Sequence, residues 1–229
     1  MMVHFHKFAR LLLPAILFSF LSAPLVAVET ASTPAEYTAV YKVMRNSKRL
    51  ARVTVQFSRQ DDVWTLHGYT HDMKGLADLL NVNGVQTVTG RWQDGSFLPQ
   101  VYDFSFSLIG YRNKWRAEFD WASGLVTTTS KSGVVELPLE SGSGDPFSLS
   151  LNISAYLDQD KPSMEVRVID EDEIKNHIYH ADLEELVDTP IGCLETTRVK
   201  RIRENAKRTS LVWYANDYNY VPVLMQHSK

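Results

Sequence analysis

Cysteine is nearly absent from this sequence of 229 residues, in which Cys193 is the single thiol. One thiol has no partner for an internal disulfide, so the folded chain must be stabilised by its hydrophobic core. Cys193 lies beside Gly192 and close to Pro190. We therefore predict that Cys193 is a small buried apolar residue rather than a nucleophile.

The sequence also lacks the short motifs that commonly mark catalysis or cofactor binding. It contains no G-x-S-x-G, no H-E-x-x-H, no paired C-x-x-C, no P-loop and no dinucleotide fingerprint. These absences lower the expectation of hydrolase, zinc, redox and nucleotide chemistry. We predict a protein that is not an enzyme and that holds no cofactor and no metal.

Long apolar runs are confined to the N-terminus. A short basic start precedes an apolar run over residues 11–28, which Pro14 and Pro24 interrupt. The tripeptide Leu25-Val26-Ala27 suits signal peptidase, so we predict a cleavable secretory signal over residues 1–27. The alternative is an uncleaved anchor, which the two prolines and the lack of stop-transfer charges disfavour. No cysteine follows the run, which excludes a lipid-anchored lipoprotein.

Positive charge is in slight deficit. The chain has 24 Lys and Arg against 27 Asp and Glu, and removal of residues 1–27 lowers its net charge from −3 to −5. This balance favours no polyanion, so we predict no nucleic-acid partner. Residues 28–36 are small and polar and read as a flexible lead-in. Residues 37–229 are long enough for one hydrophobic core and are predicted to form a single domain.

Beyond the lead-in, the dominant hydrophobic period is two. Apolar and polar residues alternate over 51–58, 102–108 and 114–121, and later candidate strands cover 164–169, 174–181, 194–203, 209–214 and 220–227. The turn signals between the early strands are Arg45-Asn46-Ser47, Gln60-Asp61-Asp62, Asp94-Gly95, Ile109-Gly110 and Ser123-Gly124. We predict a mainly β fold, an antiparallel and partly closed barrel of about ten to twelve strands with one or two short helices.

Two stretches interrupt the strand pattern. Residues 71–81 place leucines at helical spacing, which indicates a short helix or a loop covering the sheet. Residues 145–157 follow a Ser-Gly linker and begin with Asp145-Pro146, which suits a helix start. Their apolar residues nevertheless alternate as in a strand, so local pattern leaves helix and strand both open for 145–157. We favour a helix there.

Several polar groups are candidate sites. The acidic run 170–173 lacks the glycine and distal glutamate of a calcium loop and reads as a solvated turn. His177 and His180 would face opposite sides of a strand, which argues against a metal pair. His67 and His71, with Asp72, could meet a metal or a substrate at a strand end, although isolated surface histidines are commoner.

A basic segment is the last charged candidate. It contains Arg198, Lys200, Arg201, Arg203, Lys207 and Arg208. Such a cluster can contact anionic lipid head groups or lipopolysaccharide. A charged hairpin that keeps a sheet edge soluble is the simpler interpretation, and we favour it.

Five sequence segments resemble one known family. They are A-V-Y-K at 39–42, F-D-W-A-S-G at 119–124, D-P-F-S-L-S-L at 145–151, T-P-I-G-C-L-E-T-T-R-V-K-R at 189–201 and L-V-W-Y-A-N-D-Y-N-Y-V-P-V at 211–223. In these the chain resembles the exported bacterial family catalogued as domain of unknown function 3108. The resemblance implies a β-rich, partly closed barrel with a helix after the linker, located in the periplasm of a Gram-negative bacterium. It implies no activity and no catalytic residues.

The aromatic stretch near the C-terminus is predicted to be a hairpin that closes the barrel rather than a ligand platform. Trp213 and Tyr214 would end one strand, Asn216-Asp217 would form the turn, and 220–224 would return. Pro222 cannot donate a hydrogen bond to a ladder, so we expect it at an edge or a bulge.

Three functional hypotheses follow. In the first, a periplasmic barrel binds an apolar or amphipathic, lipid-like small molecule, lined by Tyr102, Phe104, Phe106, Trp115, Phe119 and Trp121, although these rings could equally fill the core. In the second, the protein is a scaffolding module that contacts an envelope protein through its sheet edges and basic hairpin. In the third, which the prolines and the inserted helix disfavour, it is an outer-membrane barrel. We therefore do not expect the chain to be an integral membrane protein after cleavage.

Overall fold

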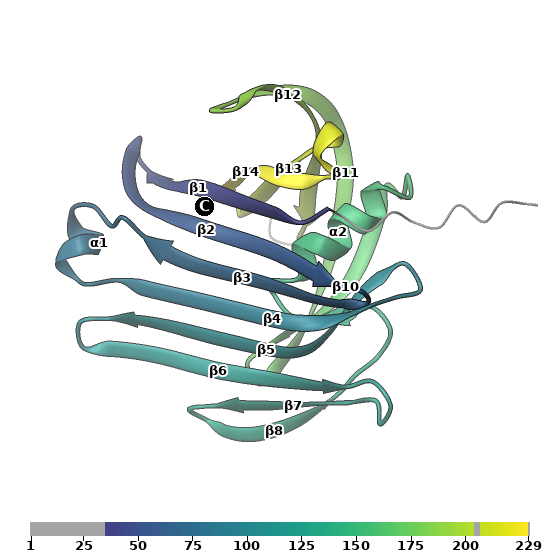
Figure 1. The fold of residues 1–229 in the computed structure, drawn as a ribbon. Coiled ribbons are helices and arrows are strands. Elements are labelled where there is room, and N and C mark those ends of the chain that lie inside the picture. Colours follow the sequence, from purple (N-terminus) through teal and green to yellow (C-terminus); the bar gives the residue numbers. More distant parts are fainter. Residues whose placement is uncertain (1–34, 204–206, 229) are drawn as a thin grey trace, which may run out of the picture.

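The computed structural model describes residues 35–203 and 207–228, so the predicted signal peptide over 1–27 lies outside the described residues. Two antiparallel sheets form the fold (Figure 1). The larger sheet is a meander in chain order: β1 (Tyr37–Arg45), β2 (Lys48–Gln60), β3 (Val63–His71), β4 (Asn83–Gln93), β5 (Ser96–Leu108), β6 (Tyr111–Asp120), β7 (Leu125–Ser130) and β8 (Gly133–Pro138).

The second sheet lies behind the upper part of the first in Figure 1. In spatial order it contains β14 (Val221–Ser228), β13 (Thr209–Ala215), β12 (Gly192–Ile202), β11 (Glu173–Thr189), β10 (Ser163–Asp170) and β9 (Ser143–Gly144). Only the short β9 pairs in parallel, against β10. The helical elements are α1 (Leu76–Leu79), α2 (Leu149–Leu157) and the 3-10 turn η1 (Asn216–Tyr218).

The alternating pattern places its apolar set in the core. Along β6, Trp115, Ala117 and Phe119 are buried, whereas the intervening Arg116 and Glu118 are exposed. Successive side chains of a strand point to opposite faces, so one face of β6 meets the core and the other meets solvent. The turns predicted between the early strands are confirmed as well. Asn46 and Ser47, for example, both adopt positive φ between β1 and β2.

Helix α2 lies between the two sheets and packs against both. Its Leu151 and Ala155 belong to the core of the large sheet, while Leu149, Ile153 and Leu157 pack against the second sheet. A helix with apolar residues on both sides must be buried on both, which explains why its sequence could also read as a strand. The preference for a helix in 145–157 is confirmed for 149–157.

The turn before α2 differs from the predicted helix start. Asp145 Oδ1 accepts hydrogen bonds from the backbone N–H groups of Phe147 (2.8 Å) and Ser148 (2.8 Å), so it stabilises a turn and not the first helical residues. The helix itself begins at Leu149. Asn152 then anchors it to β5, donating to the carbonyl of Phe97 and accepting from its N–H.

Other details also differ from the predictions. The described residues form fourteen strand segments rather than ten to twelve, because short strands such as β8 and β9 carry no strong alternation. The helix α1 forms, but it does not cover the sheet, since Leu76 and Leu79 are 65% and 73% exposed. The fold is mainly β, antiparallel and barrel-like, and its two sheets do not close into one. In the described part of the chain, no helix has the length and apolar character that crossing a bilayer requires.

Candidate functional site

The two sheets leave a seam where edge strand β1 faces edge strand β14. Each strand pairs on one side only among the described residues, β1 with β2 and β14 with β13. A single side-chain hydrogen bond joins them in the described part: the Tyr41 hydroxyl donates to the Pro222 carbonyl at 2.7 Å. Pro222 therefore lies on an edge strand, opposite Tyr214 next to a bulge, and both alternatives predicted for it are confirmed.

A groove of about 440 Å³ follows this seam. We call it the seam groove, and it is lined by Ala35, Glu36, Tyr37, Thr38, Ala39, Val40, Tyr41, Thr189, Pro190, Ile191, Asp217, Tyr218, Asn219, Val221, Pro222 and Val223. These residues come from β1, from the tip of the β11–β12 hairpin and from η1 with the start of β14. The seam groove is thus assembled from three segments that are far apart in the sequence.

Tyr37 and Tyr41 line the seam groove, and Tyr214 lies opposite Pro222 at its edge. Burial raises the pKa of Tyr37, Tyr41 and Tyr214 above the ordinary value. These hydroxyls are therefore protonated and neutral throughout the physiological pH range. The wall that they form is aromatic with a few hydrogen-bonding groups, and it carries no charge.

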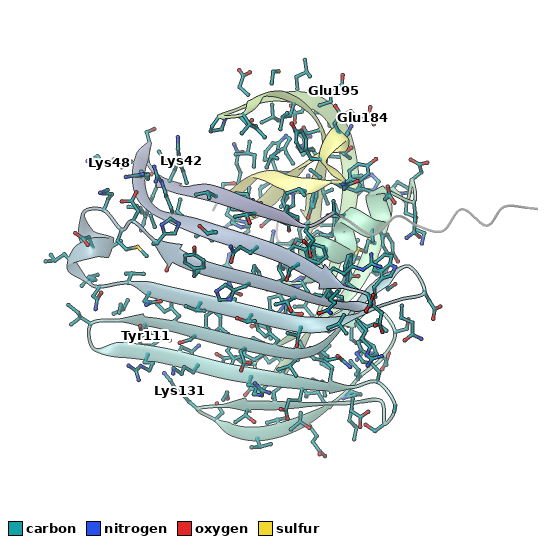
Figure 2. All side chains as sticks on the ribbon, viewed as in Figure 1. Lys42, Lys48, Tyr111, Lys131, Glu184 and Glu195 are labelled. Carbon is teal, nitrogen blue, oxygen red and sulfur yellow. The ribbon has the colours of Figure 1, made fainter. Side chains whose placement is uncertain are left out.

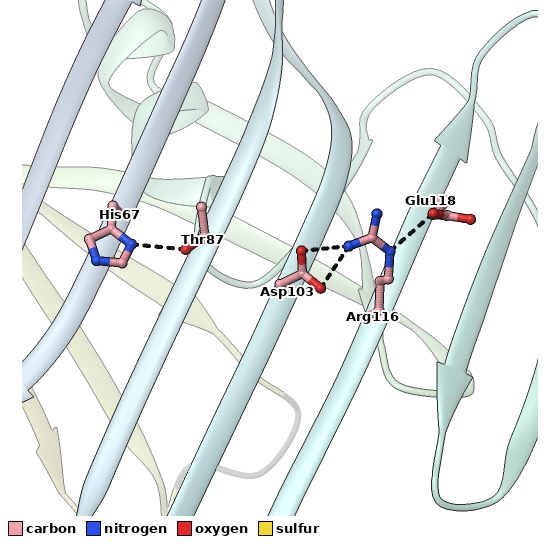
Figure 3. Close-up of polar contacts among 5 residues, drawn as sticks. All are labelled: His67, Thr87, Asp103, Arg116 and Glu118. Atoms are coloured by element: carbon pink, nitrogen blue, oxygen red, sulfur yellow. Dashed lines mark hydrogen bonds and ion pairs between the residues drawn. The ribbon is translucent and has the colours of Figure 1, made fainter.

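A polar row crosses the solvent-facing side of the large sheet (Figure 3). His67 in β3 contacts the Thr87 hydroxyl in β4 at 2.8 Å, and Arg116 in β6 bridges Asp103 in β5 (2.7 Å) to Glu118 (3.0 Å). A shallow groove of about 570 Å³ lies beside this row. The charges of Asp103, Arg116 and Glu118 pair with one another. The polar row therefore consists of contacts between neighbouring strands and offers no concentrated charge to a ligand.

The six aromatic residues predicted to line a cavity lie mostly in the core. Tyr102, Trp115 and Phe119 are buried in the core of the large sheet, and Phe104 and Trp121 pack against it. Phe106, near the end of β5, lies next to Tyr111 at the start of β6. The exposed ring of Tyr111 in turn holds Lys131 at 4.7 Å from its centroid (Figure 2).

The predicted basic segment is divided between two faces of the second sheet. Arg198 points to one face, where Asp182 (2.9 Å) and Glu185 (3.5 Å) neutralise it. Arg201 lies opposite Tyr179 on the other face. Lys200, Lys207 and Arg208 are exposed. Successive side chains of a strand point to opposite faces, so this segment cannot present all six cations on one surface.

Opposite charges mark the two hairpins that flank the seam. Lys42 and Lys48 extend from the β1–β2 hairpin, and Glu184 and Glu195 extend from the β11–β12 hairpin (Figure 2). All four side chains are exposed. Cys193 is also exposed on this second hairpin, so the prediction that it is buried is wrong. Partial desolvation and the neighbouring Asp188 raise the pKa of its thiol, which keeps it protonated.

The two histidines predicted at a strand end, His67 and His71, each contact a threonine hydroxyl. His71 contacts the Thr54 hydroxyl at 2.8 Å, and Asp72 forms ion pairs with Arg49 (2.9 Å) and Lys74 (3.1 Å). His177 is buried and His180 is exposed, on opposite faces of β11 as predicted. Residues 170–173 form the predicted turn, between β10 and β11. Among residues 35–203 and 207–228, no group of three potential metal ligands is brought together.

Comparison with known protein families shows which family the chain belongs to. The family model described as "Protein of unknown function (DUF3108)" matches residues 36–228. The chain belongs to the DUF3108 family. This confirms the resemblance seen in the sequence.

A solved structure with a similar fold is among the matches to this chain. It is the crystal structure of a β-barrel-like protein of domain of unknown function DUF1849 from Brucella abortus. The two chains have a TM-score of 0.52 at 11% sequence identity, with coverage of 86% of this chain and 92% of the other. The likeness supports the barrel-like fold alone. The curated proteins contain no match to this chain.

Sequence reasoning missed the seam groove, although one signal was present. The segments 189–201 and 211–223, which carry the family resemblance, each contribute residues to it. Pro190 and Pro222 mark places where the chain cannot continue a sheet ladder. That these places meet β1 could not be read from the sequence, because the strands concerned are not neighbours along the chain.

Proposed function

We propose that this DUF3108 protein is a non-catalytic binding protein whose seam groove holds an apolar or amphipathic, lipid-like ligand. The observation that supports this is the composition of the lining, in which only Glu36 and Asp217 of the sixteen residues carry a charge. The volume of about 440 Å³ also lies within the range of small-molecule sites, about 300–1,000 Å³.

Exposed apolar side chains at the groove give the ligand its contact surface. Val40 and Ile191 are 58% and 68% exposed, and the aromatic ring of Tyr218 is also accessible. Removing apolar surface from water contributes about 25 cal/mol per Å². An apolar chain laid between β1 and the β11–β12 hairpin tip would cover these residues together, while the polar backbone of the two edges would face its head group.

A neutral apolar probe tests the groove. N-phenyl-1-naphthylamine should bind the purified protein with a rise in fluorescence, and Val40→Glu or Ile191→Glu should weaken binding at least tenfold. Both changes place a charge in the groove at an exposed position, where folding is little affected. Val134→Glu in β8 is the matched control, since Val134 is 67% exposed and lies outside the groove. Equal binding by all four proteins would refute the proposal.

The natural ligand can be sought in the protein as cells produce it. Native mass spectrometry of protein purified from its own cell envelope should show an added mass that organic extraction removes. The Ile191→Glu variant prepared in the same way should lack that mass. A wild-type protein that always carries the bare polypeptide mass would count against a lipid-like ligand.

We also propose that the chain acts in the periplasm after cleavage behind Ala27. The basic start and interrupted apolar run of residues 1–27 support this. Osmotic shock should release a protein whose first residue is Val28. Recovery from the cytosol with residues 1–27 intact would overturn the assignment.

A second candidate function is contact with an envelope protein. It is favoured by the two strand edges at the seam, which have no ladder partner among the described residues. An extended segment of another protein could pair with such an edge. A photo-crosslinker in place of Val40 should then capture one discrete partner in cells. The same group at Ile178, which is 40% exposed on the interior strand β11, should not. Capture at neither position would leave the small ligand as the better explanation.

A further inference from the structure

Two arginines point toward the interior of the second sheet. Arg201 lies directly opposite Tyr179, and Val199 on the same face of β12 packs in the cluster that includes α2. Because side chains two apart share a face, Arg201 follows Val199 toward that interior. Arg203 follows Arg201 by two residues and lies near enough to lower the pKa of both Arg201 and His177.

These two arginines have no counter-ion in the described part of the chain. Arg201 Nε and Arg203 Nη1 are buried and lack hydrogen-bond partners, and no described carboxylate forms an ion pair with either. Two neighbouring cations are compensated: Arg198 pairs with Asp182, and Lys175 pairs with Asp170 at 2.6 Å. Desolvating a cation without pairing it costs free energy, so the arrangement favours an anion.

His177 adds a buried donor to the same place. It lies two residues before Tyr179 on β11, its side chain is only 9% exposed, and its Nε2 has no partner. Its Nδ1 lies 3.1 Å from the Tyr179 hydroxyl. An imidazole held in this way can donate one N–H to an acceptor that enters between it and the arginines.

We propose that Arg201 and Arg203, with His177 and Tyr179 beside them, form a binding site for a phosphate group. A guanidinium presents paired N–H donors that match the oxygens of a phosphate, and two guanidinium groups match its two negative charges. The site lies on the inner face of β11 and β12 and shares no residue with the seam groove. It therefore does not depend on the function proposed for that groove.

The phosphate could be free or could be the head group of a lipid, and the same donors would hold either. The partial exposure of Arg201 and Arg203 leaves them accessible from solvent. Two probes separate the sources: inorganic phosphate, and dihexanoyl phosphatidic acid below its micelle concentration. Both are titrated into the purified protein by calorimetry in a phosphate-free, low-salt buffer, with sodium chloride added to match ionic strength in a parallel series.

Charge-removing variants with a matched control make the test specific. Arg201→Gln and Arg203→Gln should each weaken phosphate binding at least tenfold. Lys200→Gln removes the same charge from the adjacent, outward-facing and exposed position, and it should change binding less than twofold. Without phosphate, Arg201→Gln should unfold at the same or a higher temperature than the wild type, because it removes a partly buried charge that no described carboxylate pairs with.

The two titrations distinguish a free anion from a lipid head group. Binding of inorganic phosphate supports a free-anion site, and binding of phosphatidic acid alone supports a lipid head group. Binding of neither probe at 10 mM overturns the proposal, as does an equal loss in Lys200→Gln, which would indicate unspecific attraction. A clear fall in the unfolding temperature of Arg201→Gln without phosphate would show that the arginine has a structural role instead.

Discussion

Tyr41 and Pro222 are 181 residues apart in the sequence, and the hydroxyl of one donates to the carbonyl of the other across the seam. The donor belongs to the first strand of the large sheet and the acceptor to the last strand of the second sheet. This contact holds the two edges close together without turning them into a ladder. The seam groove exists because β1 and β14 are joined here by a side-chain hydrogen bond and not by a strand ladder.

Replacing Tyr41 by Phe removes this bridge while keeping the ring. We expect the free energy of unfolding to fall by about 1 kcal/mol, the usual net worth of a hydrogen bond. Tyr218→Phe is the control, since its half-exposed hydroxyl makes no hydrogen bond to a described residue. Urea unfolding followed by tryptophan fluorescence measures both. Equal stability of Tyr41→Phe and wild type would show that the bridge contributes nothing.

Gly90 in β4 is a position where the core tolerates no side chain. A Cβ there would lie 2.2 Å from the Leu98 carbonyl oxygen and 2.4 Å from the Trp64 ring. Because the carbonyl is backbone and Trp64 is fully buried, neither can move easily. We expect Gly90→Ala to cost about 3 kcal/mol or more. In Gly144→Ala the new methyl meets no atom within 4 Å, so thermal unfolding of that variant should stay near wild type.

The buried carboxyl of Asp145 organises the turn before α2. Its oxygens accept from two backbone N–H groups and from the Ser148 hydroxyl, and burial raises its pKa. Asp145→Ala would leave these donors without an acceptor and should lower the free energy of unfolding by about 2 kcal/mol or more. Asp145→Asn keeps an acceptor and removes the buried charge, so it should cost clearly less. Chemical denaturation of the two variants at pH 7 gives the comparison, and equal losses would contradict this account.

Acid should weaken the fold through His177. Burial, with help from Arg201 and Arg203, lowers the pKa of His177 from 6.5 to about 4. The unfolded chain therefore takes up this proton first, and the free energy of unfolding falls as pH drops from about 6.5 toward about 4. In His177→Gln this contribution is missing, so its stability should decline less between pH 7 and pH 5. Parallel slopes for the two proteins in urea titrations would show that His177 is not responsible.

The strands and most turns follow from local pattern, with one informative failure. The alternation over 174–181 predicted a strand that ends at Ala181, whereas β11 continues to Thr189. A bulge between Ala181 and Leu183 shifts the register and reverses which residues face inward. A pattern search that assumes one continuous alternation stops at such a point, although the backbone ladder does not.

The sequence by itself determined the strand-rich architecture, the hairpins and the burial of one apolar face per strand. These depend on period-two alternation and on turn residues that accept positive φ, all of which lie within a few positions of one another. Only the tertiary structure decided that β1 meets β14, and that Arg198 is paired with a carboxylate of the described residues while Arg201 is not. Those relationships depend on pairing and packing between segments far apart in the chain, which no local pattern encodes.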